Sequence, residues 1–146
     1  MYRKILLCYD GTADGRNALR QGADVAICMG AETHLLAICR SGLDTAIPEG
    51  ITPALFQCDH DLAEGILRDG VTWLKERGLT AHGHLVYGNP LDHIPEVARR
   101  IGADLIVVGH RQRSRLARWW SDSSEETLID RTNCSILAAI APPPGG

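Results

Sequence analysis

The sequence lacks long apolar runs, an excess of basic charge and any familiar catalytic signature, and each absence excludes a class of function. The longest apolar runs, such as Leu105–Val108 and Ile136–Ala141, are far shorter than the ~20 residues of a membrane span. The 15 Lys and Arg residues against 18 Asp and Glu give a formal net charge of −3, so we expect no partner among nucleic acids or membranes. Nucleophile elbows, P-loops and HExxH patterns are missing too, so we predict no catalytic residues.

The length and composition are those of one globular domain. The chain has 146 residues, of which 45% are hydrophobic and 23% are charged, and this balance excludes a disordered tail or a coiled-coil rod. We predict a single domain over residues 1–141 and a flexible tail, rich in proline and glycine, over residues 142–146. The apolar stretch Ile5–Tyr9 is too short for the core of a secretory signal, which favours a cytoplasmic protein.

The cysteines are odd in number and widely spaced, and most stand among apolar residues. This pattern argues against a disulfide framework, and free cysteine behaves as a small hydrophobic residue. We therefore expect reduced, buried thiols at Cys8, Cys28, Cys39, Cys58 and Cys134. A thiol-based redox sensor built on Cys8, Cys39 or Cys134 is an alternative, and it would require a thiol with a low pKa.

Short apolar runs alternate with segments of helical periodicity along the chain. Strands are predicted at residues 5–9, 33–39, 79–87, 105–108 and 135–140. Helices are predicted to end before Gly30, Gly78 and Gly102, and a fourth, short helix runs from Ser123 to about Asp130. The buried faces of the first two helices are expected to include Ala18, Gly22, Val25, Ala26, Met29, Leu55, Cys58, Leu62, Ile66 and Trp73. Five strands alternating with four helices predict an α/β fold: an open, doubly wound five-stranded parallel sheet in the three-layer sandwich typical of nucleotide-binding domains.

In such a sheet, ligands bind beyond the carboxyl ends of the strands, where the strand order reverses. Two loops are predicted to converge there. One is Asp10-Gly11-Thr12 after the first strand, and the other runs from Gly109 to the helix that begins near Ser123. A carboxylate, a flexible backbone and a helix N-terminus with hydroxyls suit a nucleotide, because free N–H groups and the helix dipole favour phosphate. Thr12 and Ser123 are equally well explained as plain helix caps.

Four segments in series resemble one known family. They are Asp10-Gly11-Thr12, Tyr87-Gly88-Asn89-Pro90, Ala103-Asp104-Leu105-Ile106-Val107-Val108-Gly109 and Asn133-Cys134-Ser135-Ile136-Leu137. In this order and spacing, from Met1 to about Ile140, the chain resembles the universal stress protein family. The resemblance implies a five-stranded parallel sheet and a homodimer that pairs through the last strand.

The resemblance also reaches the phosphate loop, with two departures. ATP-binding members of the family carry, after the fourth strand, a glycine, two residues, a glycine, nine residues, a glycine and then Ser or Thr. Here Gly109 and Ser123 match the first glycine and the hydroxyl, whereas Gln112 and Asp122 replace the other two glycines. Glycine lets the backbone approach a phosphate closely, and Asp122 adds a negative charge at the phosphate end. The resemblance therefore implies a degraded ATP site.

The loop that follows Gly109 is rich in arginine and also holds two tryptophans. Its four arginines, whose guanidinium groups suit phosphate, are Arg111, Arg113, Arg115 and Arg118. They are read either as a remodelled anion site or as a solvated basic loop neutralised by Asp122, Glu125 and Glu126. Trp119-Trp120 is read as a lid, a subunit contact or part of the core.

The histidines offer a further pattern. His82 and His84 alternate in a predicted strand and so lie on one face, a spacing that could hold a metal with His34 or His60 nearby. The sequence fixes no cysteine or acidic partner at ligand spacing. We therefore expect exposed strand histidines and no metal site.

Together these observations predict a cytoplasmic, homodimeric, universal-stress-like protein with a binding or regulatory role in the stress response and no efficient catalysis. The homodimer would pair through Ser135–Ile140, because a hydrophobic edge strand is otherwise unprotected. The predicted nucleotide pocket consists of Asp10, Gly11, Thr12, Gly109, Arg111, Ser123 and Ser124. A true ATP or AMP binder with slow ATP hydrolysis is the first alternative.

Overall fold

The computed structural model describes residues 2–9, 13–39, 60–87, 90–110 and 131–140. Its strands are β1 (Lys4–Tyr9), β2 (Glu32–Cys39), β3 (Ala81–Tyr87), β4 (Leu105–His110) and β5 (Ser135–Ile140). Its helices are α1 (Ala13–Met29), α2 (His60–Glu76) and α3 (Pro90–Ile101). The predicted alternation is confirmed with three described helices rather than four, since the short helix expected from Ser123 to about Asp130 lies outside the described residues. No helix in these ranges is long and apolar enough to cross a membrane.

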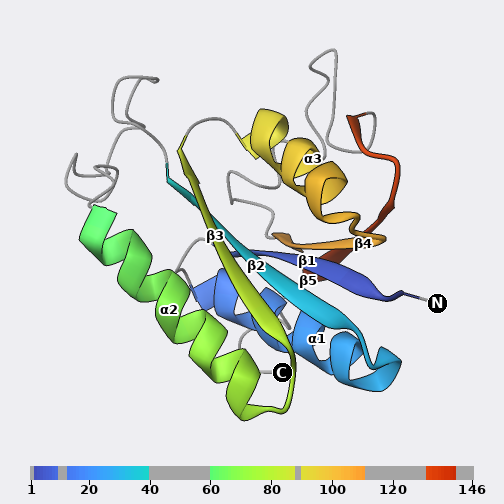
Figure 1. Ribbon diagram of the computed structural model, residues 1–146, viewed down its shortest axis with the longest axis horizontal. Helices are drawn as coiled ribbons and strands as arrows, with labels where there is room; N and C mark the ends of the chain where they lie inside the picture. The colour runs from blue at the N-terminus through green and yellow to red at the C-terminus, as the bar shows by residue number, and fades with distance from the viewer. Residues whose placement is uncertain (1, 10–12, 40–59, 88–89, 111–130, 141–146) are drawn as a thin grey trace.

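The five strands form one parallel sheet in the order β3-β2-β1-β4-β5 (Figure 1). The order reverses at β1, which pairs with β2 on one side and with β4 on the other. This is the predicted doubly wound topology, and it makes β3 and β5 the two edge strands.

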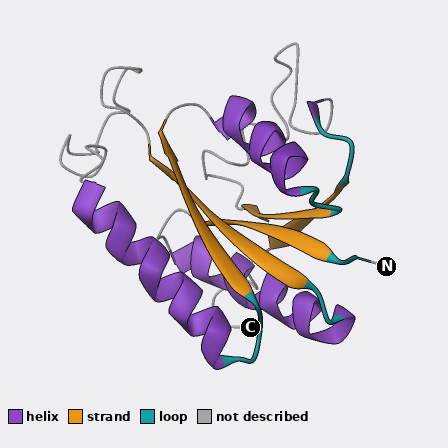
Figure 2. Ribbon diagram, in the orientation of Figure 1, coloured by secondary structure: helices purple, strands orange, loops and turns teal. Residues whose placement is uncertain are grey.

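Helices cover both faces of the sheet, α1 and α2 on one face and α3 on the other (Figure 2). Alternate residues of each central strand therefore enter different cores. In β4, Leu105 and Val107 pack in the core beneath α1 and α2, while Ile106 and Val108 pack in the core beneath α3. All four are at most 3% exposed, which confirms the prediction of a strand covered on both faces.

The three helices end in the same way, at the predicted glycines. Gly30, Gly78 and Gly102 have φ values of 64°, 85° and 72°, a backbone conformation that glycine adopts without strain. The residue after each glycine donates its amide to a carbonyl five residues earlier, as in Leu79 to Leu74 at 3.2 Å. Because its amide belongs to this helix end, Leu79 lies outside the ladder, and β3 begins at Ala81 rather than at residue 79.

Two predicted core positions are wrong. Met29 is 40% exposed and Leu62 is 62% exposed. Both stand in the terminal turns of their helices, α1 and α2, where helical periodicity continues although the turn no longer lies over the core.

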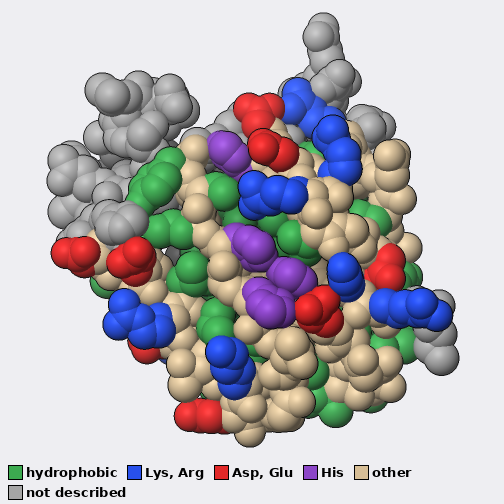
Figure 3. Space-filling view, viewed as in Figure 1, with side chains coloured by type: hydrophobic (Ala, Val, Ile, Leu, Met, Phe, Trp, Pro, Cys, Tyr) green, Lys and Arg blue, Asp and Glu red, His purple; other side chains and the backbone are tan. Residues whose placement is uncertain are grey.

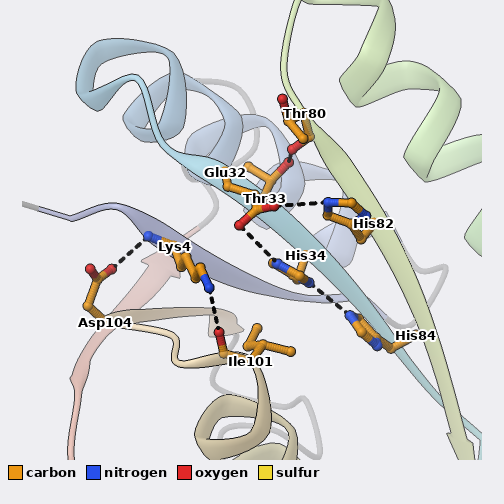
Figure 4. Close-up of polar contacts among 9 residues, drawn as sticks. All are labelled: Lys4, Glu32, Thr33, His34, Thr80, His82, His84, Ile101 and Asp104. Atoms are coloured by element: carbon orange, nitrogen blue, oxygen red, sulfur yellow. Dashed lines mark hydrogen bonds and ion pairs between the residues drawn. The ribbon is translucent and has the colours of Figure 1, made fainter.

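Asp104 holds the start of β4 against the start of β1. Its carboxylate accepts the backbone amides of Arg3 at 2.8 Å and Lys4 at 3.1 Å. The Lys4 ammonium in turn donates to the carbonyl of Ile101, the last residue of α3, at 3.2 Å (Figure 4). This aspartate, which belongs to one of the four family-like segments, therefore has a structural role.

Candidate functional site

The carboxyl edge of the sheet has the topology that the predicted nucleotide pocket requires. β1 and β4 are parallel neighbours, in the register Ile5↔Leu105, Leu6↔Ile106 and Leu7↔Val107. The chain therefore leaves both strands at the same edge, at the point where the strand order reverses.

Most of the predicted pocket residues themselves lie outside the described residues. Gly109 is described, within β4 and in register with Ala139 of β5. The others, Asp10, Gly11, Thr12, Arg111, Ser123 and Ser124, are not, and neither are the rest of the arginine-rich loop and Trp119-Trp120. The convergence of their side chains stays a prediction.

Among the three cysteines whose side chains the structure describes, Cys28 contradicts the expectation of burial. Cys8 is buried beneath α3 and Cys134 is half-buried, but Cys28 is exposed near the end of α1, so the prediction of a buried thiol is wrong there. The side chain of Cys39 and the whole of Cys58 lie outside the described part of the chain. Burial, together with the nearby Asp104 carboxylate, raises the pKa of the Cys134 thiol. A raised pKa is the opposite of what a redox-sensing thiol needs.

A cluster of polar side chains occupies the opposite, amino-terminal end of two strands. Glu32 and His34 come from the start of β2, His82 comes from the start of β3, and His84 follows two residues later in the same strand. The predicted common face of His82 and His84 is confirmed, and the register His34↔His82 brings His34 beside them. Figure 3 shows histidine side chains gathered at the surface on the side of the sheet that carries α3. We call Glu32, His34, His82 and His84 the histidine cluster.

Short contacts join the histidine cluster (Figure 4). His82 Nε2 lies 3.0 Å from Glu32 Oε1, and His34 Nδ1 lies 2.9 Å from His84 Nε2. His34 Nε2 lies 3.6 Å from Glu32 Oε2, which is too long for a hydrogen bond. The ring of His34 is stacked against both neighbours, with centroids 4.8 Å from His82 and 5.1 Å from His84. Glu32 is the partner that sequence reasoning missed.

Burial and hydrogen bonding set the charges in the histidine cluster. His34 is 9% exposed, and its buried Nε2 atom has no hydrogen-bond partner within the described residues. Burial lowers the pKa of His34 despite the Glu32 carboxylate beside it, and burial also lowers the pKa of His84, with His34 and Arg100 adding to the effect. The hydrogen bond from His82 lowers the pKa of Glu32. Near neutral pH, the imidazoles of His34 and His84 are therefore neutral, and the Glu32 carboxylate beside His34 is ionised.

Known proteins resemble both the sequence and the fold. The sequence model of the universal stress protein family matches residues 1–139. Universal stress protein MJ0531 of Methanocaldococcus jannaschii is 24% identical over 143 residues, which cover 97% of this chain and 84% of that protein. The fold is similar to that of a universal stress protein solved in complex with cAMP, with a TM-score of 0.68, 21% identity and 97% of each chain covered. It is also similar to a universal stress protein from Archaeoglobus fulgidus solved in complex with dAMP, with a TM-score of 0.64 and 20% identity over 94% of this chain and 97% of the other.

Proposed function

Because the chain belongs to the universal stress protein family, we propose that it is a regulatory protein of the stress response that binds an adenine nucleotide weakly and catalyses no efficient reaction. The observation that carries the proposal is the parallel pairing of β1 with β4 at the reversal of strand order. Two proteins with a similar fold were solved with adenine nucleotides, one with cAMP and one with dAMP.

The nucleotide would lie across the loops that follow β1 and β4. Asp10, with Gly11 and Thr12, would contact the base end. Gly109, Arg111, Ser123 and Ser124 would lie toward the phosphates, where backbone N–H groups and a helix N-terminus favour negative charge. ATP and AMP are both candidates, since they share the adenosine that this arrangement would hold.

Weak affinity follows from the two glycines that the phosphate loop lacks. Gln112 and Asp122 stand where the ATP-binding members of the family carry glycine, so the backbone approaches the phosphates less closely. Two lost hydrogen bonds to a charged group, at about 1.5–3 kcal/mol each, correspond to roughly 100-fold or more in affinity. The arginines of the same loop would offset part of that loss.

The protein would work as a cytoplasmic homodimer. β5 is an edge strand of the sheet, and within it Ile136 and Leu137 are only partly buried by their own chain. An apolar edge of this kind is a template for pairing with a second chain. A second copy paired along β5 would close it.

Calorimetric titration with ATP and magnesium tests the proposal. We expect a dissociation constant in the millimolar range for the native chain, and a gain of roughly 100-fold in affinity when Gln112→Gly and Asp122→Gly are combined. GTP is the control ligand, because a loop that merely attracts triphosphates through its arginines would bind GTP equally well. A micromolar affinity of the native chain for ATP would refute the degraded site. A double variant that binds no better than the native chain would show that the missing glycines are not the cause.

A further inference from the structure

We infer that Glu32, His34 and His82 form a binding site for a divalent transition-metal cation, with Zn²⁺ as the ion that fits best and His84 as the residue that orients His34. Two imidazoles and one carboxylate are the ligand set of many zinc sites that keep one coordination position open. Mg²⁺ and Ca²⁺ prefer sites built from oxygen ligands alone. The inference is independent of the proposed nucleotide binding, because the cluster lies at the amino ends of β2 and β3 and the nucleotide loops follow the carboxyl ends of β1 and β4.

The distances between the candidate ligand atoms suit a tetrahedral ion. Zinc binds nitrogen and oxygen at about 2.0–2.1 Å, which places two tetrahedral ligand atoms about 3.4 Å apart. Glu32 lies 3.0 Å from His82 Nε2 through one carboxylate oxygen and 3.6 Å from His34 Nε2 through the other. The ligand atoms of all three residues lie within 4.8 Å of one another. Side-chain rotation, above all of the His82 ring, would therefore bring all three ligand atoms around one ion.

The buried Nε2 atom of His34 is the polar atom of the histidine cluster that no hydrogen bond satisfies in the part of the chain that the structure describes. This atom is inaccessible to water and has no hydrogen-bond partner within the described residues. In the tautomer in which the Nδ1–H of His34 donates a hydrogen bond to His84 Nε2, 2.9 Å away, the lone pair on His34 Nε2 faces a carboxylate oxygen of Glu32 at 3.6 Å. Those two electron-rich atoms repel unless a cation lies between them. A bound ion would satisfy both, and the His34–His84 hydrogen bond would fix the tautomer that binds metal.

Protonation and nearby charges also bear on metal binding. Metals bind the neutral imidazole and the ionised carboxylate, which are the forms that burial and hydrogen bonding favour for His34 and Glu32 near neutral pH. Two cations stand close enough to act on the cluster, Lys4 on His34 and Arg100 on His84. The Lys4 ammonium is held by the carbonyl of Ile101. Because Lys4 and Arg100 would repel a bound cation, the affinity of the cluster for Zn²⁺ would be lower than that of the same site without these two residues.

The site is open to solvent on one side. The side chains of His82 and Glu32 are 50% and 33% exposed, so an ion would enter past them and keep water in its remaining position. The rings of His34 and His82 are stacked at an interplanar angle of 30°, and binding would require His82 to turn about its Cβ–Cγ bond. Its exposure leaves room for that rotation. The other two members, His34 and His84, are held on neighbouring strands of the sheet, a rigid support for a ligand site.

Titration of the full-length, tag-free and chelator-treated chain with Zn²⁺ alone tests the site. We expect saturable binding of one ion per chain by calorimetry, a rise in melting temperature with Zn²⁺ but not with Mg²⁺, and a visible absorption band of tetrahedral geometry with Co²⁺. Glu32→Gln and His82→Asn should each abolish that binding. His84→Asn should weaken it roughly 10-fold to 100-fold, the usual cost of losing a residue that orients a metal ligand. Circular dichroism verifies that each variant is folded.

His93→Asn is the matched control. His93 also faces a glutamate, Glu96, at 4.0 Å, but this pair lies on α3 outside the cluster, so the variant should bind Zn²⁺ as the native chain does. The inference is overturned if the native chain binds no Zn²⁺. It is also overturned if Glu32→Gln or His82→Asn retains the native affinity, because the ion would then be bound elsewhere, for instance at the exposed Cys28.

Discussion

Replacing Gly22 by alanine should destabilise the fold at the junction of α1 with β1 and β4. Gly22 lies in the interior of α1, and a Cβ atom at this position would collide with the side chain of Leu7 and lie 3.4 Å from Val107. Leu7 and Val107 are each 1% exposed, so neither has free space into which to move. The absence of a side chain at residue 22 is therefore what lets α1 approach these two strands.

The magnitude follows from two opposing effects. Overpacking a well-filled core costs about 1–3 kcal/mol, whereas alanine in place of glycine in a helix interior gains about 0.5–1 kcal/mol. The net loss in the free energy of unfolding should thus be about 1 kcal/mol. For a chain of this length, that loss corresponds to a fall of roughly 2–4 °C in melting temperature.

Gly65→Ala is the matched control, since Gly65 also lies inside a helix, α2, but a methyl group added there would meet no atom of another described element within 4 Å. That variant should be more stable than the native chain by about 0.5–1 kcal/mol. The helix-propensity gain is common to both variants, so their difference isolates the packing cost. Urea unfolding at equilibrium measures both values. The reasoning is refuted if Gly22→Ala is as stable as Gly65→Ala.

Two further predictions concern the edge strand and the thiols. Leu137→Lys in the edge strand β5 should give a folded monomer in sedimentation, because only β5 is proposed to pair with a second copy. Val86→Lys is the control: Val86 is also partly buried but lies in the opposite edge strand, β3, so this variant should remain a dimer. A dimer that survives Leu137→Lys would place the interface elsewhere. With iodoacetamide near pH 8, Cys28 should be alkylated before Cys134, because Cys28 is exposed and the raised pKa of Cys134 leaves less thiolate at that pH. Mass spectrometry of the digested protein checks the order, and equal rates at the two thiols would contradict it.

The strands and helices could be predicted from the sequence because their signals are local. The apolar run at 105–108 predicted a strand covered on both faces, and the structure buries all four residues. The helix ends could be predicted from three glycines, Gly30, Gly78 and Gly102. Each adopts a positive φ where its helix ends, and glycine is the residue that takes this conformation without strain. The ends of the strands could not be predicted where they depend on pairing with a distant strand. Gly109 and His110 continue β4 because Ala139 and Ile140 are there to pair with them, a fact that the sequence near residue 109 does not contain.

The histidine cluster could be predicted only in part, because it depends on register. Alternation within residues 81–87 indicated that His82 and His84 share a face. The place of Glu32 and His34 beside them follows from the pairing of β2 with β3 across 50 residues. Two parallel strands joined by a helix are not connected by a short turn, so the local sequence does not determine their register. Glu32 itself was hidden by its position at the very start of β2, before the apolar run that marks the strand.

The position of the histidine cluster also argues against chance exposure. On the face that carries α3, β2 presents Leu36 and Ile38 to the apolar core, and two residues before Leu36 on the same face stands His34. Where no helix packs over a strand, any polar side chain, such as lysine or serine, is tolerated on that face. Here it carries a buried imidazole whose Nε2 has no hydrogen-bond partner among the described residues, placed against a carboxylate and two further imidazoles. Local violations of hydrogen-bond satisfaction are tolerated mainly at functional sites, and this one lies behind the partly exposed side chains of His82 and Glu32, past which an ion would enter.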